Sequence, residues 1–213
     1  KIKIQNNKNK KILYIGRISK KRNILDGVTI KARTLKDALE KGKNTIYTID
    51  VDNWKKDILK LSIKIIIQYI KCDEVVICTS SPGAFKVLRF FKFINSKKRI
   101  YYFVSGGSLY KKIEDKVYSI ELYKNLYRIY VESEFMKEKF ISYGLIQTEV
   151  KYNFRNPLIK FDKIKKTEDK IKFIFYSRVV KDKGVEHAIR LIKRLSKGHY
   201  NVELYIYGQA KKE

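Results

Sequence analysis

Cysteine is scarce in this sequence, and the two thiols, Cys72 and Cys78, lack the spacing of metal ligands. A disulfide framework is therefore excluded, and we expect both thiols to pack in a core in a reducing compartment. Long apolar runs are also missing, because polar residues interrupt the most hydrophobic stretch, Leu59–Ile70, before it could span a bilayer. No signal peptide is recognisable, although the chain begins without Met. These absences predict a cytoplasmic protein, either soluble or peripheral to a membrane.

Acidic residues are few relative to basic ones. The chain has 49 Lys and Arg against 22 Asp and Glu, a formal net charge of +27. Part of the lysine excess accompanies an abundance of Ile, Asn and Tyr that is typical of AT-rich genomes. A field of this size favours a polyanionic partner such as nucleic acid, anionic lipid or a phosphorylated substrate, without selecting among them. The alternative is a solvated lysine-rich surface that only keeps the protein soluble.

Several signatures of other functions are missing as well. No G-x-G-x-x-G follows the first expected strand, and the segment between Gly16 and Gly27 is too long and lysine-rich for that loop. This argues against a nicotinamide-dependent dehydrogenase. Helix-turn-helix spacing, zinc-finger ligands, an RNP motif and a glycine-rich RNA clamp are also absent from the sequence. A basic nucleic-acid-binding α/β protein remains the alternative function, supported by charge alone.

What the sequence does have is a regular alternation of strand-like and helix-like segments, typical of a parallel α/β sheet. We predict a Rossmann-like domain over residues 1–152, an interdomain linker over 153–169 and a partial C-terminal domain over 170–213. The last contains one strand–helix–strand unit, over 171–177, 184–196 and 202–207, too small to be a domain by itself. The strands expected in the first domain are 12–16, 44–50, 74–79, 99–104, 128–132 and 148–152, and its expected helices are 27–41, 54–71, 84–93 and 134–143.

The most informative stretch is Phe173–Gly184, which begins with an apolar run that predicts a buried strand. Arg178 comes at the end of this strand, and Lys183 and Gly184 come just before a helical pattern. Open α/β sheets bind ligands beyond the carboxyl ends of their strands. Two cations beside a helix N-terminus can bind a diphosphate. The alternative is an Arg and a Lys on the surface of an ordinary strand–helix loop.

The segment Ser177–Gly184, S-R-V-V-K-D-K-G, resembles the G-R-x-x-x-x-K-G signature of GT-B glycosyltransferases of the GT4 type, also called glycosyltransferase group 1. Ser177 stands where that family usually has Gly. Weaker resemblances follow in the family's order along residues 12–209. They are Gly27-Val28 (a glycine-rich loop), Thr79–Gly83 (a loop near the acceptor cleft), Ser105-Gly106-Gly107 (usually H-G-G), Arg128–Phe135, Tyr152–Pro157 (the domain hinge) and Tyr205–Gln209.

The resemblance implies a retaining glycosyltransferase that uses a nucleotide-diphosphate sugar as donor substrate, with no metal and no further cofactor. Its acceptor would be a glycan or a lipid-linked glycan in bacterial surface polysaccharide synthesis. Arg178 and Lys183 would be catalytic, neutralising charge on the departing β-phosphate. The family's E-x7-E element would lie beyond Gly208, so we expect the chain to be truncated within its C-terminal domain and not to be a complete enzyme.

The resemblance also implies two sets of binding residues. The donor would contact Gly27, Arg178, Lys183, Gly184 and Gly208, and the acceptor Gly27, Lys31, Ser80, Ser105, Gly106 and Gly107. From the residues alone, Gly27 could form an ordinary turn, Lys31 could be solvated, and the two glycines after Ser105 could make a tight turn. An anionic membrane surface is a further expected partner of the basic N-terminal domain, and nucleic acid is the less favoured one.

Overall fold

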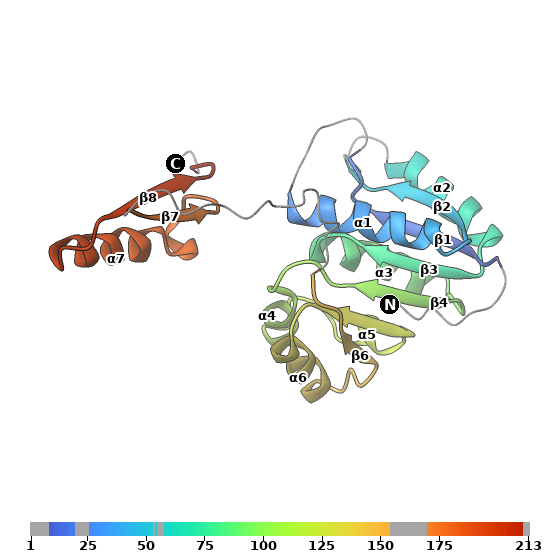
Figure 1. Cartoon of the computed structure of the whole chain (residues 1–213). Coiled ribbons are helices and arrows are strands. Elements are labelled where there is room, and N and C mark those ends of the chain that lie inside the picture. Colours follow the sequence, from blue (N-terminus) through green and yellow to red (C-terminus); the bar gives the residue numbers. More distant parts are fainter. Residues whose placement is uncertain (1–8, 20–25, 53, 55–57, 154–169, 211–213) are drawn as a thin grey trace. The chain divides into compact units, whose positions relative to one another are not determined.

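The computed structural model describes residues 9–19, 26–52, 54, 58–153 and 170–210. Contacts along the chain divide it into two compact units, Lys1–Pro157 and Leu158–Glu213, each of which is considered by itself (Figure 1). The predicted linker over 153–169 lies outside the described residues except for Asn153. The linker, including Asn156-Pro157, therefore stays a prediction.

The first unit is built on a six-stranded parallel sheet with the strand order β2-β1-β3-β4-β5-β6. Because β1 lies between β2 and β3, the strand order reverses there, which is the position where open α/β sheets commonly bind ligands. The six predicted strands are confirmed with small shifts at their ends. Their bounds are β1 Lys11–Gly16, β2 Thr45–Asp50, β3 Glu74–Cys78, β4 Arg99–Phe103, β5 Arg128–Val131 and β6 Thr148–Val150.

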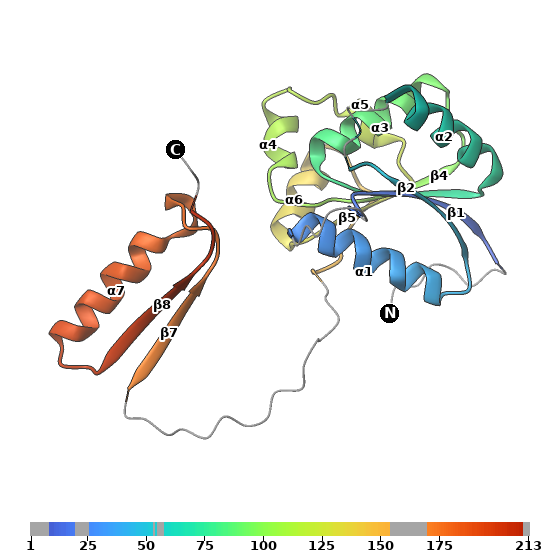
Figure 2. The ribbon, with the colours of Figure 1, turned by 90° about the horizontal axis from the view of Figure 1, so that it is seen from above.

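Helices cover both faces of this sheet. Figure 2 shows α1 on one face and α2 and α3 on the other. Among the described residues, no helix is long and apolar enough to cross a membrane. The helix bounds are α1 Gly27–Lys41, α2 Ile58–Lys71, α3 Ser81–Phe93, α4 Leu109–Glu114, α5 Glu121–Lys124 and α6 Glu134–Ser142.

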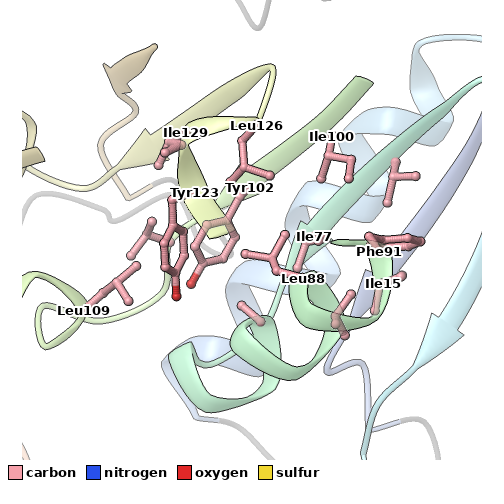
Figure 3. Packing of buried hydrophobic residues seen from close by; sticks show 14 of the residues in the cluster. Ile15, Ile77, Leu88, Phe91, Ile100, Tyr102, Leu109, Tyr123, Leu126 and Ile129 are labelled. Carbon is pink, nitrogen blue, oxygen red and sulfur yellow. The ribbon is translucent and has the colours of Figure 1, made fainter. Parts of the chain in front are cut away.

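Alternation along the strands produces two hydrophobic cores. In β1, Ile12 and Tyr14 pack in the cluster that contains the buried residues of α1, whereas Leu13 and Ile15 pack in the larger cluster on the opposite face. This is the two-residue period of a strand whose two faces are both covered. The larger cluster also takes in Ile77 and aromatic side chains from α3, β4 and α5 (Figure 3). The core therefore fixes the strands whose carboxyl ends form the first unit's candidate site.

Two helix predictions for the first unit need correction. The helix expected to start at residue 84 begins at Ser81, because Ser80 takes the N-cap position and Pro82 fits the first turn. The last three residues of Thr79–Gly83 are therefore helical rather than part of an open loop. Short helices α4 and α5, which the sequence analysis did not anticipate, connect β4 to β5. Of the helix expected over 54–71, the structure describes α2 from Ile58, and residues 55–57 lie outside the described residues.

The second unit is the predicted strand–helix–strand element. Strand β7 (Ile171–Tyr176) pairs in parallel with β8 (Val202–Tyr207), and between them come a short 3-10 helix, η1 (Lys181–Lys183), and α7 (Val185–Lys197). The prediction that β7 is buried was wrong: none of the described residues 170–210 is buried. Among these residues only α7 packs on the two-stranded sheet, so one face of the sheet is left uncovered (Figure 2).

Candidate functional site

The predicted diphosphate site lies where β7 ends. Beyond the strand, the Ser177 amide donates to the Tyr207 carbonyl at 3.1 Å, and the Val179 amide donates to the Gln209 carbonyl at 3.0 Å. Arg178 lies between these two residues. Its backbone is therefore held beside the segment that ends β8, while its side chain is exposed. The structure thus places the guanidinium at the carboxyl end of the strand, as the sequence predicts.

The turn after Arg178 leads directly into α7. The Lys183 amide donates to the Val180 carbonyl at 3.0 Å, and the Gly184 amide donates to the Lys181 carbonyl at 2.9 Å. Gly184 has a φ of +80°, a left-handed conformation that glycine adopts without strain, and it is the N-cap of α7. No side chain caps this helix start. Its first amide groups therefore remain available to an anion beside Lys183.

The two cations of this turn have no acidic partner in the part of the chain that the structure describes. Among the described residues, neither Arg178 nor Lys183 forms an ion pair with a carboxylate. Glu186, in the first turn of α7, instead faces Arg190, with 3.8 Å between its Oε2 and the Arg190 Nη2. Two exposed cations beside a helix start form an arrangement that can bind a diphosphate.

Gly208 lies beside Ser177 at the carboxyl ends of β7 and β8. A Cβ at Gly208 would come within 1.7 Å of the Ser177 carbonyl oxygen, so only glycine permits the backbone segments at the ends of β7 and β8 to lie this close. The packing of the backbone accounts for this glycine. Its predicted contact with the donor stays a prediction.

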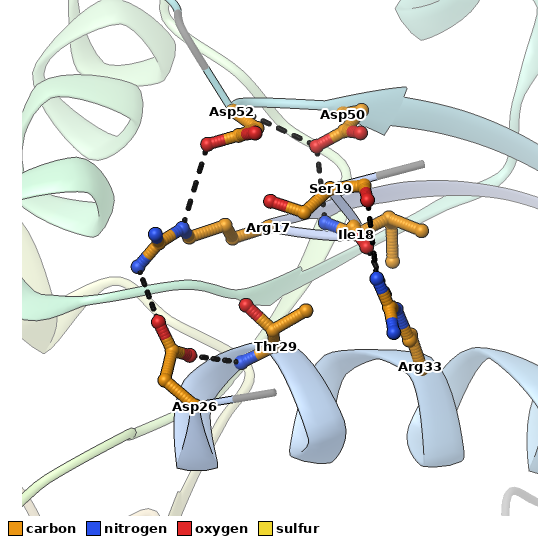
Figure 4. A network of polar contacts seen from close by, with 8 residues as sticks. All are labelled: Arg17, Ile18, Ser19, Asp26, Thr29, Arg33, Asp50 and Asp52. Carbon is orange, nitrogen blue, oxygen red and sulfur yellow. Dashed lines mark hydrogen bonds and ion pairs between the residues drawn. The ribbon is translucent and has the colours of Figure 1, made fainter. Parts of the chain in front are cut away.

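In the first unit, a polar network fixes the start of α1 (Figure 4). Asp26 caps the helix, because its Oδ1 accepts from the Thr29 amide at 2.8 Å, and its Oδ2 lies 2.8 Å from the Arg17 Nη1. Arg17 also approaches Asp52 at 3.6 Å. A Cβ at Gly27 would meet nothing within 4 Å, so packing does not require a glycine there. Its contacts with donor and acceptor stay predictions.

Lys31 is engaged within the protein. Its side chain is 6% exposed, and its ammonium donates to the Val104 carbonyl at 2.7 Å and to the Glu132 Oε1 at 2.6 Å. The alternative of a solvated Lys31 is therefore wrong, while a role in acceptor binding stays a prediction. Sequence reasoning missed Glu132, whose place directly after β5 was the only available signal. The pair ties α1 to the carboxyl ends of β4 and β5.

The structure brings Ser80 and Ser105 side by side in an isolated parallel bridge beyond β3 and β4. Ser105 is buried, with its Oγ 4.0 Å from the Sγ of Cys78. Burial raises the pKa of the Cys78 thiol, which disfavours a nucleophilic thiolate. Gly106, at a φ of +86°, has open space where its Cβ would be, as does Gly107. The predicted acceptor residues Ser80, Ser105, Gly106 and Gly107 therefore share one edge of the sheet.

Next to Ser80, a cavity of about 720 Å³ opens between α2 and α3. Arg17, Asp52, Ser80 and Lys86 contribute polar groups, and the Lys86 Nζ lies 3.4 Å from the ring centroid of Trp54, which also lines the cavity. This volume is in the range of small-molecule sites. Sequence reasoning did not find this cavity, because its shape depends on how far apart the two helices lie. Most of the remaining lining is apolar: Val51, Ile58, Leu61, Ile65, Pro82, Val87 and Phe90.

Comparisons with known proteins support the fold. No protein-family model matches the sequence, and no curated protein matches it either. Solved structures of HepE (Alr3699) from Anabaena do match. The HepE complex with UDP and glucose gives a TM-score of 0.56 at 16% identity, over 95% of this chain and 62% of that one. The HepE complex with UDP gives a TM-score of 0.51 at 11% identity, over 94% of this chain and 69% of that one.

This chain thus spans less than two thirds of the first HepE structure. At such low identity the likeness shows the fold alone. It confirms the predicted α/β fold class, a Rossmann-like parallel sheet followed by one strand–helix–strand unit.

Proposed function

We propose that this chain is part of a retaining glycosyltransferase of the GT4 type that takes its sugar from a nucleotide-diphosphate donor, with UDP as the favoured nucleotide. The observation that carries the proposal is a pair of exposed cations at the turn between β7 and α7, Arg178 and Lys183, neither of which has a carboxylate partner among the described residues. The likeness in fold to HepE, which was solved with UDP, supports the choice of nucleotide.

In the proposed reaction, Arg178 and Lys183 bind the diphosphate and neutralise the charge that develops as the sugar–phosphate bond breaks. The guanidinium can donate two parallel hydrogen bonds to phosphate oxygens, and the ammonium adds a point charge. The amides at the start of α7 and Gly184 lie in the same turn and add donors. The acceptor hydroxyl attacks the sugar carbon on the same face from which the diphosphate departs. The proton of the hydroxyl passes to the phosphate oxygen of the leaving group. The two cations would supply the positive charge that a metal supplies in other transferases.

The acceptor is proposed to bind at the carboxyl-end edge of the first sheet, where Ser80 and Ser105 lie together. Ser80 also lines the apolar cavity between α2 and α3. Because an apolar lining favours a hydrocarbon group, a lipid-linked glycan is the better candidate of the two predicted acceptor classes. Gly27, Lys31, Gly106 and Gly107 are proposed as further acceptor contacts.

The cellular setting is proposed on the same grounds. A lipid-linked acceptor and a strongly basic chain favour a cytoplasmic enzyme that is peripheral on an anionic membrane, in bacterial surface polysaccharide synthesis. The second unit is proposed to be one part of a larger donor domain. Exposed apolar side chains such as Ile174, 69% exposed, and Tyr176, 85% exposed, support this, because complete α/β domains cover both faces of a parallel sheet.

Calorimetric titration with UDP, GDP and UMP tests the donor site. We expect saturable binding of UDP, and a loss of about tenfold or more in Arg178→Ala/Lys183→Ala, since hydrogen bonds to charged groups are the strong ones. The control is Arg194→Ala/Lys197→Ala, which removes the same charge from the opposite end of α7. Absence of saturable binding in the wild type would contradict the proposal. Equal losses in both variants would assign binding to bulk charge and favour the nucleic-acid alternative.

A further inference from the structure

The outer surface of α2 carries apolar side chains that the proposed sugar transfer does not use. Only Ile65 of this helix is buried, although the helix consists mostly of isoleucine, leucine and lysine. Leu59 and Ile70 are 78% and 72% exposed, and Ile63 is 58% exposed. Soluble proteins rarely leave several neighbouring large apolar side chains in water without a binding role.

The exposed residues follow helical spacing. Leu59, Ile63, Ile66 and Ile70 recur at i, i+4, i+7 and i+11, which places them in one stripe along the helix. A second stripe lies beside it, formed by the exposed lysines Lys60, Lys64 and Lys71 at i, i+4 and i+11. We call the two stripes together the α2 face.

The charge of the α2 face is uncompensated. Helix α2 contains no Asp or Glu, and among the described residues none of its three lysines pairs with a carboxylate. A second copy of this chain docked through the same helix would bring the lysines of one α2 toward those of the other, and α2 itself has no acidic residue to offset them. An anionic bilayer complements both stripes, because its headgroups are negative and its interior is apolar.

We propose that the α2 face docks on an anionic lipid bilayer, with the apolar stripe inserted below the headgroups and the lysine stripe among the phosphates. The inference rests on the proposed function, because a lipid-linked acceptor would reside in such a bilayer, and it deepens that function by naming the docking surface. Ile58, Leu61 and Ile65 of the same helix line the apolar cavity. Docking would therefore hold the proposed acceptor cavity beside the membrane.

Vesicle sedimentation of the whole chain tests the apolar stripe. The probes are vesicles of phosphatidylcholine alone and vesicles of two parts phosphatidylcholine to one part phosphatidylglycerol. We expect binding only to the second kind, with a blue shift in the emission of Trp54, the single tryptophan, four residues before α2. Ile63→Ser/Ile70→Ser should lower the affinity by about tenfold or more. Ile146→Ser, a change at an 80% exposed apolar residue outside α2, should leave it unchanged.

A second pair of variants tests the lysine stripe. Lys60→Gln/Lys64→Gln should weaken vesicle binding by about fivefold per lysine. The control Lys193→Gln/Lys197→Gln removes the same charge at the same spacing from α7 and should have little effect. Equal losses in the two pairs would assign binding to net charge and overturn the proposal.

Two further measurements separate the remaining outcomes. A dimer in lipid-free buffer that Ile63→Ser/Ile70→Ser dissociates would assign the α2 face to a second copy and overturn the proposal. UDP titration of the same variant should match the wild type, because neither residue lies in the second unit. The wild type could show the expected vesicle binding and yet fail to bind UDP. This result would uphold the docking surface and contradict the proposed donor site.

Discussion

The two units of this chain each contain an apolar strand, and the two strands differ in burial. All five residues of β3 in the first unit are buried, whereas β7 in the second unit, which is richer in aromatic and β-branched side chains, has none buried. The difference lies in what covers the strands, since β3 has helices on both faces and the β7–β8 pair, among the described residues, has only α7 packed on it. An apolar run therefore predicts a strand, while its burial depends on the layers around it.

The same contrast holds for the cations of the two units. Lys31 and Arg17 in the first unit are held by Glu132, Asp26 and Asp52, whereas Arg178 and Lys183 in the second unit have no carboxylate partner among the described residues. A cation that already pairs with a carboxylate attracts an anionic ligand less strongly than a cation without such a partner. This difference is why the diphosphate site is proposed in the second unit.

The largest expected effect is a difference in the loss of stability between an alanine substitution in β3 and one in β7. Ile77→Ala removes a fully buried side chain from β3 and should lower the free energy of unfolding by about 2–5 kcal/mol. Ile174→Ala in β7, where the side chain is 69% exposed, should change it by less than about 0.5 kcal/mol. Urea unfolding followed by Trp54 fluorescence reports the first unit, and hydrogen exchange of the β7 amides reports the second. Similar losses at both positions would contradict the contrast in burial.

A smaller effect concerns the cations. Lys31→Met leaves the Glu132 carboxylate and the Val104 carbonyl without their donor, and should cost about 2 kcal/mol of unfolding free energy. The value lies below that of a fully buried pair because the Glu132 side chain is 21% exposed. Lys183→Met, which breaks no pair, should be nearly neutral. Urea unfolding of both variants checks this, and Lys31→Met/Glu132→Gln should recover part of the loss if the unpaired charge causes it.

The smallest effects compare the helix starts. Asp26→Ala removes the side-chain cap of α1 and should lower the stability of the first unit by about 1 kcal/mol. Gly184→Ala at the start of α7 should cost about 1 kcal/mol for another reason, the positive φ, since its Cβ would meet only the His187 ring at 3.7 Å. Thermal melts and hydrogen exchange of α7 check both values. Gly184→Asn should cost less than Gly184→Ala, and the reverse order would rule out the backbone explanation.

Much of the fold could be predicted from the sequence because the signals are local. The strand periodicity, the cap at Ser133 and the glycine after α6, at a φ of +82°, all depend on neighbouring residues. The early start of α3, the helices α4 and α5 and the exposure of β7 were missed. The first two depend on capping and on short segments with weak periodicity, and the third depends on the layers around the strand.

The candidate site divides in the same way. The position of Arg178 follows from the length of one strand, and that of Lys183 and Gly184 from the start of the next helix. The pairing of Lys31 with Glu132 joins residues 101 positions apart, and no local sequence pattern predicts it. The apolar cavity depends on the spacing of two helices, which the sequence does not state. Site residues were therefore predictable where one turn places them, and not where distant elements meet.

Residue-resolved NMR of the whole chain titrated with UDP tests the central claim most directly. The account predicts saturable chemical-shift changes of the amides of Ser177–Gly184 and Gly208-Gln209. The Arg178→Ala/Lys183→Ala change should abolish these changes and leave the amides of the first unit unaffected. Shifts confined to the lysine-rich surface of the first unit, or none at saturating UDP, would contradict a nucleotide-diphosphate site at the turn between β7 and α7.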